Sequence, residues 1–243
     1  MKTFVLTSDK YSFLLEGYSH FFNKYWDDSI EVTVLCFDKP NVKLPENFTI
    51  QSLGKQSQFS NWSDALIPVF SKLQDDRFFM CFEDHFLIKK VDTKLFDCSM
   101  DMMDIDKSIC KVWTLCKPTI INPEYSNSFY KWRKTSGCLI PSSLLPSVWK
   151  TDYFNRLLRP NLDCHSFEVV NDNKLNGKIV IYPKEWPLYP SLDAMRYGRF
   201  NDKIFENYKR NKSASNQVWQ QDLLEEDIQI FRNMRKNRIK LYG

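Results

Sequence analysis

The sequence predicts an α/β protein with a mainly parallel central sheet flanked by helices, ending in a helical basic C-terminal region. Segments rich in β-forming residues alternate with amphipathic segments of helical spacing along most of the chain. Such an order needs crossover connections, which place the strands parallel. In addition, residues 77–82 (RFFMCF) form an apolar run of the kind found in a central strand that is buried on both faces.

The first half of the chain reads as strand, helix and strand. Residues 3–7 are β-rich, and the three residues 8–10 can turn the chain and cap a helix. Apolar side chains then recur at helical spacing from Leu14 to Tyr25, which predicts an amphipathic helix. Further strands are expected at 31–37, 48–53 and 77–82, with a second helix that begins at 61–64 and ends near residue 75.

The second half continues the alternation and then becomes helical. The pattern predicts a helix at 93–105, a strand at 111–116, a helix within 144–158 and a strand at 178–182. Beyond about residue 200 the spacing is helical. That region has a capping box at Asp222 and Glu225 and an apolar stripe at Leu224, Ile228, Phe231 and Met234.

Composition and motifs argue against several classes of protein. Apolar residues make up 43% and charged residues 26% of the chain, which excludes intrinsic disorder. The seven cysteines include no C-x-x-C pair, so a disulfide framework, a zinc ribbon and a thioredoxin motif are disfavoured. The sequence contains no G-x-G-x-x-G fingerprint, Walker loop or G-x-S-x-G elbow. Dehydrogenases, P-loop enzymes and α/β-hydrolases are therefore poor interpretations.

The N-terminal segment predicts a cytoplasmic protein with no membrane partner. Its apolar run, from Phe4 to Leu6, is too short for a signal peptide. No stretch of the sequence approaches the roughly 20 apolar residues of a membrane-spanning helix.

The net charge of +4 is concentrated at the C-terminal end. Residues 196–243 carry 11 basic and 6 acidic side chains, a net charge of +5, and the remainder of the chain is nearly neutral. A basic arm on a near-neutral body suits an anionic partner such as nucleic acid or a nucleotide. A solvated helix end explains the same charges equally well.

The sharpest chemical feature follows the apolar run. Glu83, Asp84 and His85 come directly after residues 77–82, and open α/β sheets bind ligands at the carboxyl ends of their strands. Carboxylates are hard oxygen ligands that hold Mg²⁺ or Mn²⁺ against a diphosphate. We therefore expect Glu83, Asp84 and His85 to form a divalent metal site. An acidic turn exposed to water is the alternative.

Short motifs occur in a characteristic order over about the first 200 residues. They are L-T-S-D-K-Y at 6–11, L-G-K-Q at 53–56, W-S-D-A-L at 62–66, F-E-D-H-F-L at 82–87, V-D at 91–92, P-S-V-W-K at 146–150, F-E at 167–168 and R-Y-G-R at 196–199. In this order the chain resembles GT-A-fold glycosyltransferases, in particular small ones of bacteriophages and bacteria. It departs from them at the D-x-D motif, whose outer positions hold Glu83 and His85, and at Leu145 and His165.

The resemblance implies a fold, a reaction and a set of binding residues. The implied GT-A-like domain spans 1–199, with a donor-binding half at 1–92 and an acceptor half at 93–199, followed by the helical basic region at 200–243. The implied reaction moves a sugar from a nucleotide-diphosphate sugar, expected to be UDP-linked, to a hydroxyl acceptor. The residues implied to bind the sugar donor are Thr7, Ser8, Asp9, Gln56, Trp62 and Asp64, with Arg196 and Arg199 neutralising the leaving diphosphate.

Several of these residues also have ordinary structural explanations. Asp9 can be a helix N-cap, Trp62 can be a core residue, and Arg196 and Arg199 can be exposed cations after a turn.

The reaction needs a carboxylate that removes the proton of the acceptor hydroxyl. Glu168 is the candidate for this base, because it lies in the half that resembles the acceptor-binding segment. Asp163 is its rival, and either residue can be an ordinary surface carboxylate.

The expected acceptor is the hydroxymethyl group of a modified cytosine in phage DNA, within the host cytoplasm. The resemblance to phage enzymes, a composition typical of an A+T-rich coding sequence and the C-terminal charge favour it. Such an enzyme flips the base out of the duplex, where Tyr130, Trp132 and Trp149 can stack on it unless they belong to the core. The expected phosphate contacts are Arg232, Arg235, Lys236, Arg238 and Lys240.

Other functions stay open at this point. The acceptor can be a surface glycan or a small molecule. A metal-dependent nuclease that uses Asp64, Glu83 and the basic C-terminal arm is another alternative. It is disfavoured because the chain has His85, and not a lysine, two residues beyond Glu83. A non-catalytic nucleic-acid-binding module leaves the acidic strand end unexplained. The sequence predicts no oligomeric state.

Overall fold

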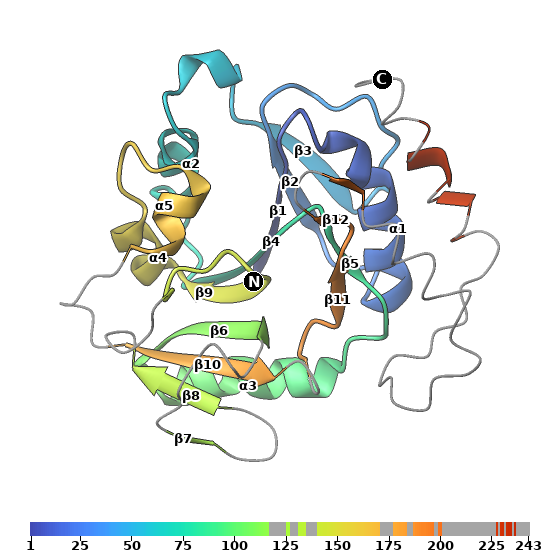
Figure 1. Ribbon diagram of the computed structural model, residues 1–243. Coiled ribbons are helices and arrows are strands. Elements are labelled where there is room, and N and C mark those ends of the chain that lie inside the picture. The colour runs from blue at the N-terminus through green and yellow to red at the C-terminus, as the bar shows by residue number, and fades with distance from the viewer. Residues whose placement is uncertain are drawn as a thin grey trace.

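A computed structural model of the chain describes residues 1–116, 125–126, 131–134, 140–170, 177–183, 187–196, 199–200, 227, 229–230, 232–234 and 236. The centre of the molecule is a nine-stranded sheet with the strand order β3-β2-β1-β4-β9-β6-β10-β8-β7 (Figure 1). In chain order its strands are β1 (Lys2–Leu6), β2 (Val32–Cys36), β3 (Phe48–Ser52), β4 (Arg77–Phe82), β6 (Ile109–Cys116), β7 (Tyr125–Ser126), β8 (Lys131–Lys134), β9 (Ser147–Lys150) and β10 (Lys178–Pro183).

Most strands of this sheet run in one direction. β3, β2, β1 and β4 are successive parallel neighbours, and β6 is parallel to β10. Only two of the described strands run the other way: β9 is antiparallel to β4 and β6, and β8 is antiparallel to β10 and β7. The predicted mainly parallel sheet flanked by helices is therefore confirmed. Two small ribbons accompany it, β5 (His85–Leu87) with β11 (Ser191–Asp193) and β12 (Met195–Arg196) with β13 (Arg199–Phe200).

Helices cover both faces of the sheet. α1 (Leu15–Tyr25) and α3 (Thr93–Ile105) pack on one face, against side chains such as Val5 and Phe79. α2 (Trp62–Phe70), α4 (Thr151–Leu157) and α5 (Cys164–Glu168) cover the other face, against Phe4 and Phe78, and lie together in Figure 1. Successive side chains of a strand point to opposite faces. The apolar residues of β4 therefore enter both cores, as their continuous run predicts.

The helices begin where their sequence provides caps. Asp92 caps α3, because its Oδ1 accepts a hydrogen bond from the backbone N–H of Leu95 at 3.0 Å. Asn61 and Asp64 form a capping box at the start of α2. Two short 3₁₀ turns, Ser12–Leu14 and Gln56–Gln58, complete the helical elements of the first half. Among the described residues, no helix is both long and apolar enough to cross a membrane.

The clearest difference from the sequence prediction is β9. Residues 144–158 were expected to contain a helix, and they do, but α4 is preceded by a strand that pairs with both β4 and β6. Four residues are too few for periodicity to distinguish a strand from a helix. Long-range pairing, which the local pattern does not encode, fixes β9.

The C-terminal region is anchored on α1. Asp227 is fully buried. His20 Nε2 lies 2.8 Å from its Oδ1, and Lys24 Nζ lies 2.5 Å from its Oδ2. Met234 is also fully buried, and the absence of a Cβ on Gly17 leaves room for its sulfur. The described residues between 227 and 236 are helical, as predicted. The other members of the predicted stripe and both capping-box residues lie outside the described residues.

We expect Asp227→Asn to loosen this anchor. The substitution removes the negative charge that faces Lys24 and His20, and losing a hydrogen bond between charged groups costs about 1–3 kcal/mol of unfolding free energy. Urea unfolding followed by circular dichroism measures the loss, with the exposed Asp28→Asn as the matched control. An Asp227→Asn midpoint equal to that of the control contradicts the anchor.

Candidate active site

A cleft of about 460 Å³ opens where β1 and β4 end. Because parallel neighbours end at the same edge of a sheet, the residues after them lie side by side. Leu6 is in register with Phe82, and the backbone N–H of Glu83 donates to the carbonyl of Leu6 at 3.3 Å. The predicted site residues that line the cleft are Thr7, Ser8, Trp62, Glu83, Asp84, His85 and Glu168.

Glu83 and Asp84 are carboxylates in a poorly hydrated place. Glu83 is only 4% exposed. Burial, together with the neighbouring charge of Asp84, raises its pKa well above the usual value, although the Thr7 hydroxyl and backbone hydrogen bonding partly oppose the shift. Burial also raises the pKa of Asp84, and Asp193 adds to it while His85 opposes it. The backbone of this turn is fixed, because the N–H of Ala194 donates to the Asp84 carbonyl at 2.6 Å.

His85 is the first residue of β5 and faces Asp193 on β11. The two residues are register partners, with Nδ1 and Oδ1 3.3 Å apart. Burial disfavours the charged imidazole, but Asp84, Asp193 and Glu168 together outweigh it and raise the pKa of His85.

The predicted metal-ligand set is not assembled. Among the described residues, no three His, Cys, Asp or Glu side chains converge as ligands of one ion. These side chains do not fit a ready metal site.

A buried polar cluster supports the strand end from below. The Tyr18 hydroxyl lies 2.8 Å from Cys81 Sγ and 3.1 Å from the Tyr189 hydroxyl. The Tyr189 hydroxyl in turn donates to the carbonyl of His85 at 3.4 Å. These contacts join α1, β4 and the segment before β11, and through the His85 carbonyl they reach the residues that follow β4.

Glu168 enters the cleft from the last turn of α5. Its Oε1 accepts hydrogen bonds from the backbone N–H of Leu144 at 2.7 Å and from the Ser143 hydroxyl at 3.3 Å. No described residue donates a hydrogen bond to its other carboxylate oxygen, Oε2. The carboxylate is thus held by one oxygen, which leaves the other for a ligand. Cys164, on the same helix, lines the cleft, but burial raises its pKa to about 12, so it is a poor nucleophile.

Asp163 occupies the N-cap of α5 rather than the cleft. Its Oδ1 accepts from the Ser166 backbone N–H at 2.6 Å, and that hydrogen bond lowers its pKa. Of the two carboxylates proposed as the base, only Glu168 lines the cleft.

Three residues expected to bind the sugar donor do not line the cleft. Asp9 is not a helix N-cap either, because the N-caps of the Ser12–Leu14 turn and of α1 are Tyr11 and Leu14. Its Oδ1 accepts a hydrogen bond from the backbone N–H of Asp38 at 3.0 Å. Gln56 is exposed on a 3₁₀ turn. Asp64 binds backbone: Oδ2 accepts from Asn61 N–H at 3.1 Å, and Oδ1 from Asn161 N–H at 2.9 Å.

The aromatic expectations have mixed outcomes. Trp62 both lines the cleft and packs on Phe167, with ring centroids 5.2 Å apart. Trp149 is fully buried in β9, so the stacking role expected for it is wrong and its alternative, a core residue, is correct. Tyr130 lies outside the described residues, and only the backbone of Trp132, in β8, is described.

The basic residues are only partly described. The backbones of Arg196 and Arg199 pair with each other in the β12–β13 ribbon, next to Met195, which lines the cleft. Arg232 and Lys236 are exposed in the C-terminal helix. Three further residues of the predicted phosphate-binding set lie outside the described residues: Arg235, Arg238 and Lys240.

Sequence reasoning missed several residues of the cleft. Tyr11, Leu144, Leu145 and Met195 line it, and all lie in turns or very short elements whose sequences carry no periodic signal. Ser143 and Leu144, which donate hydrogen bonds to Glu168, were missed for the same reason.

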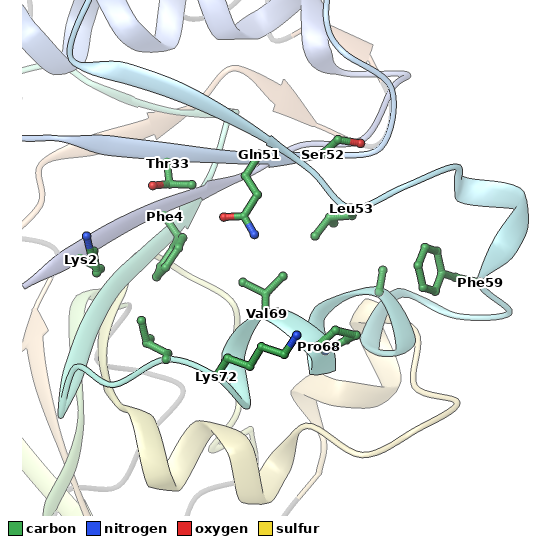
Figure 2. A pocket seen from close by; sticks show the side chains of 12 residues that line it. Lys2, Phe4, Thr33, Gln51, Ser52, Leu53, Phe59, Pro68, Val69 and Lys72 are labelled. Atoms are coloured by element: carbon green, nitrogen blue, oxygen red, sulfur yellow. The ribbon is translucent and has the colours of Figure 1, made fainter.

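A second hollow, of about 500 Å³, lies between α2 and strands β1 to β3. Figure 2 shows the side chains that line it. Gln51 and Val69 point into it from opposite walls, and Lys2 and Lys72 lie at its border (Figure 2). Neither a carboxylate nor an imidazole lines it, and none of the predicted site residues does. The first cleft is therefore the candidate active site.

Comparison with known proteins identifies no family. No known family model matches the chain, and no curated protein matches it in sequence. Among solved structures, the chain is similar to a cytidylyltransferase from Leptospira borgpetersenii serovar Hardjo-bovis, with 11% identity and a TM-score of 0.47, over 92% of this chain and 98% of that one. It is also similar to HddC from Yersinia pseudotuberculosis, with 10% identity and a TM-score of 0.46, over 84% and 96%. Similarity this low transfers no substrate, reaction or residue role.

We expect Asp64→Ala to weaken the fold and to leave ligand binding in the cleft unchanged. Its carboxylate satisfies backbone N–H groups at the start of α2 and before α5, and losing a cap of this kind costs about 0.5–2 kcal/mol. Chemical unfolding measures this loss, with the exposed Ser57→Ala as control. Calorimetric titration with UDP-glucose measures binding. Weaker UDP-glucose binding at unchanged stability contradicts the capping role and favours direct contact with the nucleotide.

Proposed function

We propose that the chain is a glycosyltransferase that uses a nucleotide-diphosphate sugar. One observation carries the proposal. Side chains from four separate segments, each part of the resemblance to GT-A-fold glycosyltransferases, line the same cleft. Thr7 and Ser8 follow β1, Trp62 starts α2, the Glu83–His85 turn follows β4, and Glu168 ends α5. A pocket of this kind, with few convergent polar groups on apolar walls, is typical of a small-molecule site.

Glu168 is the proposed base of the transfer. Its Oε2 takes the proton of the acceptor hydroxyl while Oε1 stays bound to Leu144 N–H and the Ser143 hydroxyl. The acceptor oxygen forms its bond to the anomeric carbon as the bond from that carbon to the diphosphate breaks. The nucleoside diphosphate leaves with the electron pair of the broken bond.

The sugar donor is proposed to bind along the ends of β1 and β4. Thr7, Ser8 and Trp62 line the side of the cleft nearest β1 and α2, where the nucleoside would lie. Arg196 follows Met195, a residue of the cleft wall, which supports a role for Arg196, and with it Arg199, beside the departing diphosphate. Titration calorimetry with UDP-glucose, with and without Mn²⁺, tests both the sugar donor site and the metal dependence expected from the sequence.

We expect Glu168→Gln to bind UDP-glucose as the wild type does and to transfer sugar about 10²–10⁴-fold more slowly, because the loss of one general base has an effect of this size. Steady-state kinetics and calorimetry separate the two quantities. The exposed Glu31→Gln serves as the matched control. If Asp163→Asn is crippled and Glu168→Gln is not, Asp163 is the base.

The proposed acceptor is a hydroxymethylated cytosine in duplex DNA. The exposed positions of Arg232 and Lys236 support binding to a polyanion. A base inside a duplex must be flipped to reach a cleft, at a cost of a few kcal/mol.

We expect binding to hydroxymethylcytosine DNA to weaken steeply with salt. Each phosphate neutralised contributes a log–log slope of about −0.9, so the double variant Arg232→Ala and Lys236→Ala should make the slope about 1.8 units shallower. Fluorescence anisotropy at several salt concentrations measures it. The control is Lys94→Ala with Lys107→Ala, which removes two exposed lysines near the ends of α3.

The acceptor and the reaction are tested together by mass analysis of the products. The enzyme is incubated with hydroxymethylcytosine DNA and a panel of UDP-sugars, and the nucleosides are weighed after digestion. A gain of one sugar mass supports the DNA acceptor. A gain only on a glycan or small-molecule acceptor overturns the DNA acceptor and keeps the transferase. Release of pyrophosphate from UTP or CTP and a sugar phosphate, with no sugar transfer, overturns the glycosyltransferase.

A further inference from the structure

Lys111 is a charged residue in the middle of the core. It lies in β6, is fully buried, and has Trp113 and Trp149 beside it. Its Nζ lies 3.6 Å from the ring centroid of Trp149 and 4.8 Å from that of Trp113. Lysine is almost never fully buried unless its ammonium group is paired or hydrogen-bonded. A buried lysine at this position lowers the stability of the fold, because its charge must be removed from water. A methionine of similar shape would fill the same space without that loss.

The ammonium group binds the loop that holds Glu168. Lys111 Nζ donates to the carbonyl of Ser143 at 2.5 Å and lies 3.4 Å from the carbonyl of Pro141. The same loop is tied to the end of α5, because the Ser142 hydroxyl donates to the carbonyl of Val170 at 2.5 Å. The loop is therefore hydrogen-bonded on one side to Lys111 of the sheet and on the other side to Val170, just after α5.

One peptide group connects Lys111 with Glu168. The Ser143 carbonyl and the Leu144 N–H belong to the same planar peptide unit. The carbonyl accepts from Lys111, and the N–H donates to Glu168 Oε1 at 2.7 Å. Carbonyl and N–H point in opposite directions in a trans peptide, so a cation at the oxygen fixes the N–H toward the carboxylate. A hydrogen bond at one end also polarises the group and strengthens the bond at the other.

We propose that Lys111 is a positioning residue that orients the Glu168 carboxylate through the Ser143–Leu144 peptide. The proposal rests on the proposed function of Glu168 as the base. Lys111 does not touch the substrate. It holds the peptide in the orientation that presents an N–H to Oε1, which directs Oε2 into the cleft. Without the ammonium group the peptide is free to rotate, and a carbonyl oxygen turned toward the carboxylate repels it.

A double-mutant cycle tests the proposal. Lys111→Met keeps the volume between the two tryptophans and removes the donor, and we expect it to lower kcat about 10- to 100-fold, the effect of a misplaced catalytic group, with KM for UDP-glucose unchanged. In the Glu168→Gln background the same substitution should cost almost nothing, because the carboxylate that it positions is absent. Lys150→Met is the control in both backgrounds: Lys150 is a half-buried lysine on the neighbouring strand β9, and its Nζ donates to the carbonyl of Lys107 rather than to the loop that holds Glu168.

A purely structural role gives a different result. Equal losses in both backgrounds, or wild-type kcat in Lys111→Met, overturn the proposal. Wild-type kcat in Glu168→Gln overturns the assignment of the base instead, so the two failures are distinguishable. If Lys111→Met does not fold, Lys111→Gln, which keeps a shorter neutral donor, is taken through the same cycle. Amide hydrogen exchange at Leu144 gives a readout without substrate: faster exchange in the Lys111 variant than in Lys150→Met supports the contact, and equal exchange overturns it.

Discussion

The parallel pairing of β1 with β4 is the constraint on which the candidate active site depends. It brings residues 6 and 82 into register, so that the turn after each strand opens at the same point of the sheet edge. Thr7 then lies beside Glu83 even though 75 positions of sequence separate them. The apolar cores on both faces of β4 hold that register, because a slip of one residue would exchange its buried side chains between faces. The polarity of the cleft is therefore a consequence of hydrophobic packing beneath it.

The antiparallel strand β9 adds the second half of the cleft. An antiparallel strand begins at the edge where its parallel neighbours end, so the segment before β9 arrives at the carboxyl ends of β4 and β6. That segment carries Ser143, Leu144 and Leu145, which hold Glu168 or line the cleft. A parallel strand at this position would have delivered the same segment to the opposite edge. The direction of one short strand thus determines whether the two groups of side chains meet.

The sequence predicts the long elements well. It also predicts that Glu83, Asp84 and His85 follow a buried strand, but it does not predict most contacts of the candidate site. The α3 bounds and the buried strand β4 follow from caps and apolar runs, and the strand-end acids follow from the position of β4. Local pattern does not encode partners that lie far away in the sequence. Asp64 resembles a ligand-binding residue, and only the fold reveals that its oxygens face Asn61 and Asn161. Lys111 could have been singled out from the sequence, because it is a lysine inside the apolar strand ICKVWTLC. Burying a charge in such a strand is costly unless the charge has a partner.

The proposed division of the chain into donor and acceptor halves does not coincide with a break in the sheet. β4 belongs to the first half and hydrogen-bonds to β9 of the second, and β9 bonds to β6. A cut near residue 92 leaves β4 and β9 as unpaired apolar edges, the kind of surface that promotes aggregation. The two proposed halves are therefore not separate units of folding. Chimeras that exchange acceptor specificity with other proteins therefore need junctions that keep β4 and β9 as a matched pair, and split reporters need fragments that meet before either edge is exposed.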